Sequence, residues 1–235
     1  MWALSLYPEA GEGGGCLSVP RALPVQGRPP DGERAADEAA RRARGKIRRY
    51  AAANRLNRLG TLTYAGEGCH DPRRLRGDLA GFFRELRSGL GGDRFAYVWV
   101  PQWHPGGHGL HAHFAVGRYV PRRLIERSWG QGFVHIKLLD GLPVGSGALA
   151  EARLAARYLA RYVGRERDDG RRLAGLHRYE VAQGFQPTKI DCYGADADDV
   201  IARASRYMGS TPERIWLSST VEGWHGPPAC WAQWN

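Results

Sequence analysis

The chain has 235 residues, a formal net charge of +10 at pH 7 and a sequence pI of about 9.8. This length suffices for one domain with a proper core, and the positive excess favours a polyanionic partner, nucleic acid first. All but three of the 34 basic residues are arginines, which bind phosphate in a bidentate manner, although a high-GC coding sequence raises arginine content by itself.

The same composition excludes several classes of protein. No apolar stretch is long enough to span a membrane, so we expect no membrane partner. The four cysteines form no CxxC pair, which argues against a zinc ribbon and a disulfide framework. The first residues lack the basic and apolar regions of a secretory signal, so we expect a cytoplasmic protein with reduced thiols.

The amino-terminal part divides into a tail and a basic helix. Residues 1–32 are rich in Gly and Pro, which predicts a flexible tail. Residues 33–57 are rich in alanine and arginine, both good helix formers, and this helix either follows a phosphate backbone or presents a solvated charged face. The arginines of this region that are candidates for DNA binding are Arg48, Arg49, Arg55 and Arg58.

The spacing of apolar residues predicts the remaining elements. Residues 59–64 and 94–103 are expected to be strands, and a helix from Asp71-Pro72 to about residue 88 lies between them. A Pro-Gly-Gly turn folds the second strand back onto a strand that contains His111. The later elements are helices at 121–128, 148–163 and 196–208 and strands at 133–138, 177–182 and 215–219, and the last residues show no clear pattern.

The segment His111-Ala112-His113 is the first candidate for chemistry. Side chains alternate along a strand, so the two histidines project from one face and can hold one divalent cation between them. Gln102 shares a face with Val98 and Val100 on the neighbouring strand, where an amide oxygen is a reasonable third ligand. The alternative is a half-buried strand that happens to carry histidines. His104 and His108 lie in the turn, with either a substrate contact or no specific role.

Two tyrosines form the second candidate. Tyr158 and Tyr162 are four residues apart and share one helix face with Arg161 and Arg165, which predicts a basic, exposed face. A tyrosine pair with this spacing is by itself more typical of packing. Together with a histidine pair and a basic chain it favours phosphodiester transesterification, in which a phenol attacks a phosphate neutralised by a divalent ion and a guanidinium.

These motifs resemble those of the HUH endonucleases, and among them the rolling-circle replication initiators of phages and plasmids. His111-Ala112-His113 is similar to their His-hydrophobic-His motif, and Tyr158-Leu159-Ala160-Arg161-Tyr162 to their paired-tyrosine motif. Residues 59–64, Leu-Gly-Thr-Leu-Thr-Tyr, are similar to their first motif. Conjugative relaxases usually place the tyrosine before the histidines, whereas this order is that of the initiators. The resemblance covers roughly residues 45–185.

The resemblance implies an α+β fold, a ferredoxin-like or RRM-like palm whose central antiparallel sheet carries helices on one side. It implies Mg²⁺ or Mn²⁺ held by His111, His113 and a third polar residue. It also implies nicking of single-stranded or hairpin origin DNA by Tyr158 or Tyr162, leaving a 5′-phosphotyrosine and a free 3′-OH. On this interpretation residues 33–195 form the endonuclease domain, and residues 196–235 form an extension on or near it.

Two positions depart from the family pattern. Arg161 stands where a lysine is common, and arginine cannot readily exchange a proton. Gln102 stands where glutamate is common and supplies no negative charge, which leaves His104 as the alternative third ligand.

The expected partners follow from what the motifs include and lack. No GxxxxGK[ST] phosphate loop occurs, so unwinding requires a host helicase, and the free 3′-OH requires a host polymerase. Two other functions remain open: a small HUH transposase, although these typically use a single tyrosine, and a non-catalytic basic DNA-binding protein with structural histidines. The sequence separates neither a plasmid from a phage origin nor the first from the second attacking tyrosine.

Overall fold

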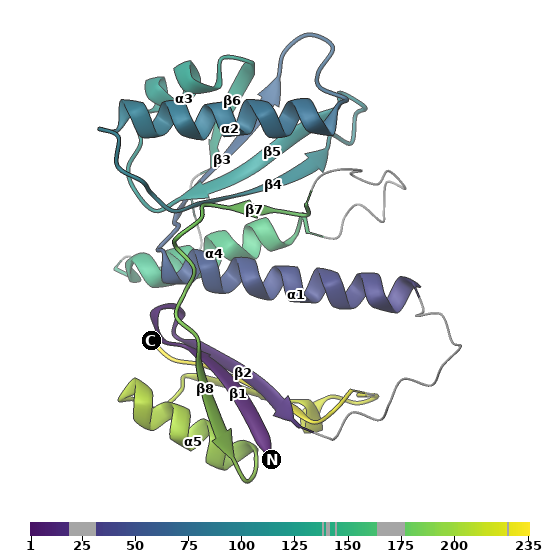
Figure 1. Cartoon of the computed structure of the whole chain (residues 1–235), viewed down its shortest axis with the longest axis vertical. Coiled ribbons are helices and arrows are strands. Elements are labelled where there is room, and N and C mark those ends of the chain that lie inside the picture. Colours follow the sequence, from purple (N-terminus) through teal and green to yellow (C-terminus); the bar gives the residue numbers. More distant parts are fainter. Residues whose placement is uncertain (19–31, 138, 140–141, 144, 164–176, 225) are drawn as a thin grey trace. The chain divides into compact units, whose positions relative to one another are not determined.

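The computed structural model describes residues 1–18, 32–137, 139, 142–143, 145–163, 177–224 and 226–235. The chain divides into two compact units, one of Glu33–Phe185 and one that combines Met1–Gly32 with Gln186–Asn235 (Figure 1). Each unit contains one five-stranded antiparallel sheet with helices packed on it. The predicted α+β class with antiparallel sheets is therefore confirmed.

Unit 2, residues 33–185, contains the segment that carries the motifs. Its strands lie in the order β6-β3-β5-β4-β7, so that β5 is the middle strand. The strands are β3 (Arg58–Tyr64), β4 (Tyr97–Trp103), β5 (Leu110–Val116), β6 (Gly132–Lys137) and β7 (Glu180–Val181). The helices are α1 (Gly32–Ala53), α2 (Pro72–Gly89), α3 (Arg122–Trp129) and α4 (Gly147–Ala160).

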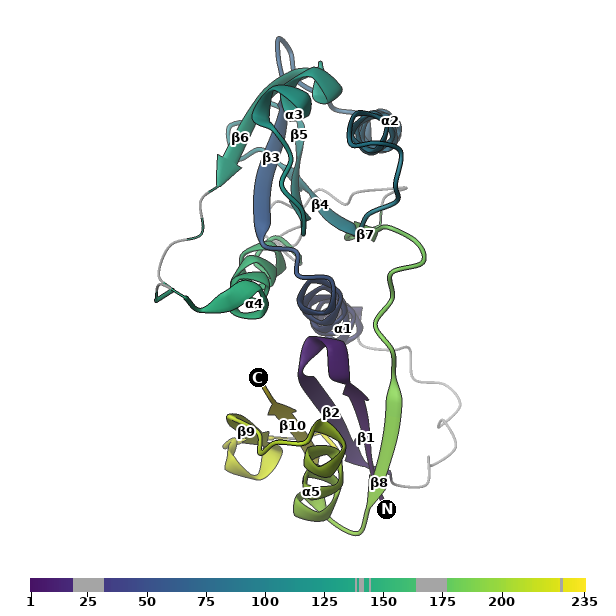
Figure 2. The ribbon, with the colours of Figure 1, turned by 90° about the vertical axis from the view of Figure 1, so that its left-hand side faces the viewer.

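Side chains of β5 alternate between two hydrophobic cores. Leu110 and Phe114 pack with residues of α2 and α3, whereas Ala115 packs with residues of α1 and α4. His111 and His113 share the face of Ala115. Figure 2 shows α2 and α4 on opposite sides of this sheet. The expectation of helices on one side is wrong, because β5 is buried along its whole length and needs apolar cover on both faces.

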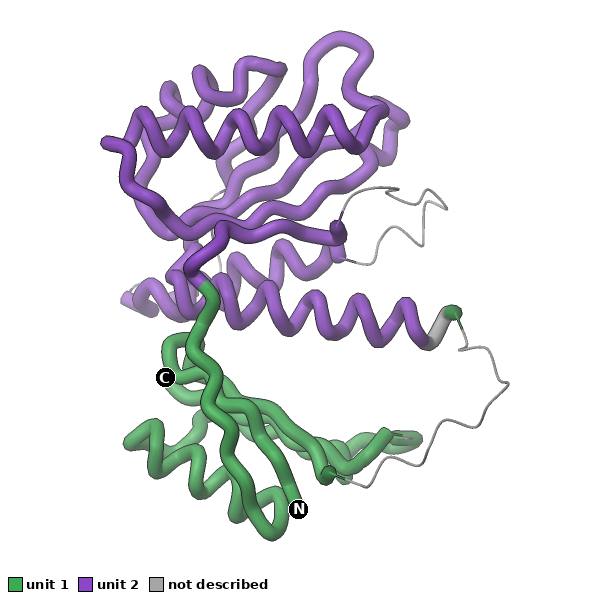
Figure 3. The backbone as a smooth tube through the Cα atoms, viewed as in Figure 1, with its two compact units in different colours: residues 1–32, 186–235 green, residues 33–185 purple. Residues whose placement is uncertain are grey.

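Unit 1 joins the two ends of the chain, drawn in green in Figure 3. Its strand order is β8-β1-β2-β10-β9, so the central strand β2 pairs with strands from both ends of the chain. The core of the unit contains Leu4, Leu6, Val200 and Trp234. The elements are β1 (Trp2–Tyr7), η1 (Pro8–Ala10), β2 (Glu12–Leu17), β8 (Ile190–Gly194), α5 (Ala197–Met208), β9 (Arg214–Leu217), η3 (Ser218–Thr220) and β10 (Ala229–Gln233).

The predicted flexible tail over residues 1–32 is wrong for residues 2–17, which form β1 and β2; residues 19–31 lie outside the described part. The glycines there serve close strand packing rather than flexibility. A Cβ atom on Gly15 would lie 1.9 Å from the carbonyl oxygen of Ala3. The predicted boundary at residue 195 also differs from the observed one at Phe185, because β8 pairs with β1 in unit 1.

Among the described residues, no helix combines the length and apolar character needed to cross a bilayer.

We predict that Gly60→Ala destabilises unit 2 by roughly 1–3 kcal/mol, because an added Cβ would lie 2.4 Å from Cε1 of the buried Phe114 ring. Gly77→Ala, where nothing lies within 4 Å, is the matched control and should stabilise α2 by about 0.5–1 kcal/mol. Hydrogen exchange of the β5 amides in urea measures both effects. Equal protection in the two variants would show that Phe114 does not confine β3.

Candidate functional site

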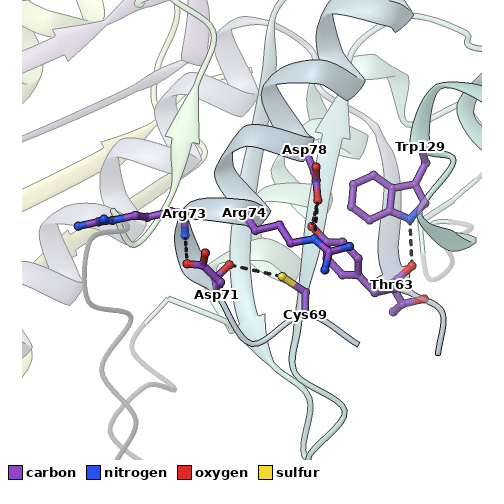
Figure 4. Close-up of polar contacts among 8 residues, drawn as sticks. Thr63, Cys69, Asp71, Arg73, Arg74, Asp78 and Trp129 are labelled. Carbon is purple, nitrogen blue, oxygen red and sulfur yellow. Dashed lines mark hydrogen bonds and ion pairs between the residues drawn. The ribbon is translucent and has the colours of Figure 1, made fainter. Parts of the chain in front are cut away.

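The face of the sheet opposite the histidines fixes the position of β3. Asp71 caps α2 by accepting a hydrogen bond from the Arg73 amide at 2.8 Å (Figure 4). The Trp129 indole donates to the Thr63 carbonyl at 2.9 Å, and the Tyr64 hydroxyl donates to Asp78 at 2.8 Å. These bonds tie α2 and α3 to β3, so the other face of β3 is held in a fixed register beside β5.

On that other face, three side chains from two strands converge. The Nε2 atoms of His111 and His113 lie 3.2 Å apart, and Oε1 of Gln102 lies 2.9 Å from Nε2 of His113. Gln102 is paired directly with His111 in the β4–β5 ladder. Both histidines are buried, at 6% and 5% exposure. The alternation of side chains along β4 and β5 therefore brings the three predicted ligand candidates together.

The separations between these atoms fit a shared cation. Adjacent ligands of an octahedral Mg²⁺ or Mn²⁺ ion are about 3 Å apart, close to the two distances above. Among the described residues, no three His, Cys, Asp or Glu side chains form a metal-holding group, so the third donor has to be an amide such as Gln102. The His104 ring centroid is 5.6 Å from that of His111, and the contact of Gln102 with His113 favours Gln102 over His104.

Burial keeps His111 neutral. Desolvation, followed by the charge of His104, lowers the pKa of His111 from 6.5 to about 4. A neutral imidazole has a lone pair free for a metal, whereas an imidazolium has none. Nδ1 of His111 is buried without a hydrogen-bond partner in the described part of the chain.

Thr61 is a site residue that the sequence interpretation missed. It pairs with His113 in the β3–β5 ladder, and its hydroxyl oxygen lies 2.9 Å from Nδ1 of His113. A bond from that nitrogen orients the ring and leaves Nε2 directed at Gln102. Thr61 belongs to the first motif, but only the strand register identifies it as the partner of His113.

The two tyrosines lie against the histidine pair. The Tyr162 ring stacks on the His113 ring with centroids 3.7 Å apart and planes at 13°, and the Tyr158 ring meets His113 edge-on at 6.1 Å. Tyr158 and Tyr162 are 5.3 Å apart. The predicted exposed face is wrong, because both rings are half-buried and pack against the core formed with α1 and α4. Helix α4 ends at Ala160, so Tyr162 lies in the following turn.

Two cationic groups flank Tyr158. Cζ of Arg161 lies 5.9 Å from the centroid of the Tyr158 ring, and Nζ of Lys137 lies 5.1 Å from it. Lys137 is the last residue of β6 and was not among the predicted site residues. Its alternation with Phe133 and His135 along that strand is the signal that could have placed it on the histidine face.

The predicted DNA-binding arginines have different surroundings. Arg58 is exposed at the start of β3, while Arg48 and Arg49 are half-buried on α1. Arg55 has a φ of 52° and donates to the Ala52 carbonyl, which makes it part of the turn that ends α1. Arg165 lies outside the described residues.

The geometry defines an α+β unit in which two buried imidazoles, an amide and two phenols meet on one sheet face. A sequence model of a family of replication-associated proteins, of the ORF2 and gene II protein type, matches residues 57–167. This segment, just under half of the chain, runs from the start of β3 past Tyr162 and contains all five of these residues. No curated protein and no solved structure matches the chain. The similarity therefore links the segment that carries the site to DNA replication.

We predict that His111 makes stability depend on pH. Between the unfolded pKa of 6.5 and the folded pKa of about 4, the unfolded chain binds more protons than the folded one. The free energy of unfolding should therefore rise with pH across this window, by at most about 3 kcal/mol from this residue. Unfolding measured by hydrogen exchange of β5 at several pH values should show a flatter profile for His111→Gln. Parallel profiles for the two proteins would contradict the assigned pKa.

Proposed function

We propose that this chain is a rolling-circle replication initiator that nicks single-stranded or hairpin origin DNA through a tyrosine and later rejoins the ends. The observation that carries the proposal is the stacking of Tyr162 on His113, within the same group of contacts as His111, Gln102 and Tyr158. The match of residues 57–167 to a replication-associated family supports the choice of DNA as the substrate.

The proposed metal is Mg²⁺ or Mn²⁺, held by Nε2 of His111, Nε2 of His113 and Oε1 of Gln102. When bound, the ion neutralises charge on the scissile phosphate and orients it for in-line attack. Two imidazole nitrogens favour Mn²⁺ over Mg²⁺, since Mg²⁺ prefers oxygen ligands. Thr61 fixes the ring of His113 through Nδ1.

In the cleavage step the phenol of Tyr158 or Tyr162 loses its proton, and its oxygen attacks phosphorus. The bond between phosphorus and the 3′ oxygen breaks, and that oxygen takes up a proton and leaves as the free 3′-OH. The phosphate remains on the tyrosine as a 5′-phosphotyrosine. Lys137 and Arg161, both near the Tyr158 ring, neutralise charge on the phosphate as the new bond forms.

The covalent intermediate retains the energy of the phosphodiester bond, so a second transesterification joins ends without ATP. Both tyrosines contact His113, and this arrangement favours a two-tyrosine initiator over a single-tyrosine transposase. A purely DNA-binding protein has no need for phenols against a buried histidine pair. Unwinding and extension of the 3′ end are assigned to a host helicase and polymerase.

The first test is covalent capture. Incubation with a library of single-stranded oligonucleotides and Mn²⁺ should yield a protein–DNA adduct whose attached peptide contains Tyr158 or Tyr162. Tyr158→Phe/Tyr162→Phe should lose capture by at least about 1000-fold, since no other nucleophile is positioned there, while retaining DNA binding. Tyr119→Phe, which changes an exposed ring outside the sheet, is the control. Capture that persists in the double variant would refute the proposal.

The second test concerns the third ligand. Gln102→Glu replaces a neutral amide oxygen with a carboxylate of nearly the same shape, so affinity for Mn²⁺ should rise by about tenfold or more. Gln102→Ala should lower it. Titration calorimetry with MnCl₂ measures both, without DNA. Equal Mn²⁺ affinity in all three proteins would remove Gln102 from the centre, and His104→Ala would then identify the alternative ligand.

A further inference from the structure

Strand β6 presents three unlike side chains on the face that carries the histidines. Val134 and Ile136 point the other way and pack against the core formed with α2 and α3. Phe133, His135 and Lys137 alternate with them and therefore lie on the histidine face. Lys137 reaches the Tyr158 ring, which agrees with this assignment.

The register places these side chains close to the centre. His135 pairs with Thr61, and Thr61 pairs with His113, so the three lie in one row across β6, β3 and β5. Phe133 pairs with Thr63, one row further along β3. Two strand spacings, roughly 10 Å, separate β6 from β5. The Phe133 ring therefore lies a few nucleotide lengths from the proposed position of the scissile phosphate, at a rise of roughly 3.4 Å per stacked nucleotide.

The Phe133 ring is unusually accessible. It is 69% exposed, and Thr63 and Tyr64 beside it use their carbonyl and hydroxyl groups to bind the opposite layer rather than to cover the ring. It lies on β6, an edge strand of the sheet, where exposed apolar groups invite aggregation. In the described part of unit 2, Tyr119 is the other large exposed hydrophobic residue, and it lies outside the strands.

We propose that Phe133 stacks on a base of single-stranded DNA within about three nucleotides of the phosphate that Tyr158 or Tyr162 attacks. A single strand exposes the flat faces of its bases, whereas a duplex buries them in the stack, so this ring selects single-stranded DNA. Lys137, two strand pairs further along the same face, binds the backbone phosphate. The proposal rests on the proposed function for the identity of the attacked phosphate.

Affinity measurements test the stacking directly. In the uncleaving Tyr158→Phe/Tyr162→Phe background, fluorescence anisotropy with oligothymidylate at several salt concentrations is measured for Phe133→Ala, Phe133→Trp and Tyr119→Ala. We expect Phe133→Ala to weaken binding by about tenfold or more, Phe133→Trp to retain it and Tyr119→Ala to leave it unchanged. The salt dependence should not change in Phe133→Ala, because no ionic contact is lost, whereas Lys137→Met should lower the slope by about one.

Photocrosslinking provides a second, structural readout. Oligothymidylate in which one base is 5-iodouracil should crosslink to Phe133 on irradiation, and mass spectrometry should identify the residue. Unchanged affinity in Phe133→Ala, or crosslinks only elsewhere, would overturn the proposal. Self-association that depends on Phe133 while DNA affinity stays constant would also overturn it, since β6 would then be a pairing edge.

Covalent capture by the unsubstituted protein separates this proposal from the proposed function. If DNA is captured but Phe133→Ala binds oligothymidylate normally, only the stacking proposal fails. If no strand is captured but Phe133→Ala loses affinity and the crosslink, the nicking function fails and the stacking contact stands.

Discussion

The packing of α4 on the histidine-bearing face of the sheet is the interaction on which the candidate site depends. Ala152, Ala155 and Ala156 are fully buried in the helix, and such small side chains let its backbone approach the strands closely. Because of this approach, Tyr158 and the turn residue Tyr162 reach His113. The same contact closes the second core of unit 2, so the stability of the unit and the geometry of the site are coupled.

This arrangement has an energetic cost in the middle of the sheet. β5 is apolar on either side of the histidine pair, and the two imidazoles occupy positions where aliphatic side chains would stabilise the fold more. Thr61 and Gln102 offset part of the cost for His113, whereas Nδ1 of His111 has no partner within the described residues. Burial keeps the rings close together and His111 uncharged, which are the conditions that cation binding requires.

Local periodicity accounts for the parts of the site that could be predicted. The two-residue repeat of β5 and the four-residue spacing of the tyrosines are short-range properties, and so the faces of His111 and His113 follow from the sequence. Thr61 and Lys137 required the register between strands far apart in the chain. Unit 1 was missed for the same reason, since Gly14 of β2 pairs with Trp231, more than two hundred residues later. A glycine run gives no local sign of such a partner.

The proposed ligand set has a consequence for charge. His111, His113 and Gln102 are all neutral donors when the imidazoles are unprotonated, so a divalent ion bound there would keep its full charge of +2. Lys137 and Arg161 near Tyr158 add further positive charge on the same side. The compensating anions are then the DNA phosphate and the attacking phenolate, which a carboxylate ligand would partly replace. Metal binding and DNA binding at such a centre strengthen each other reciprocally, because each supplies the charge that the other lacks.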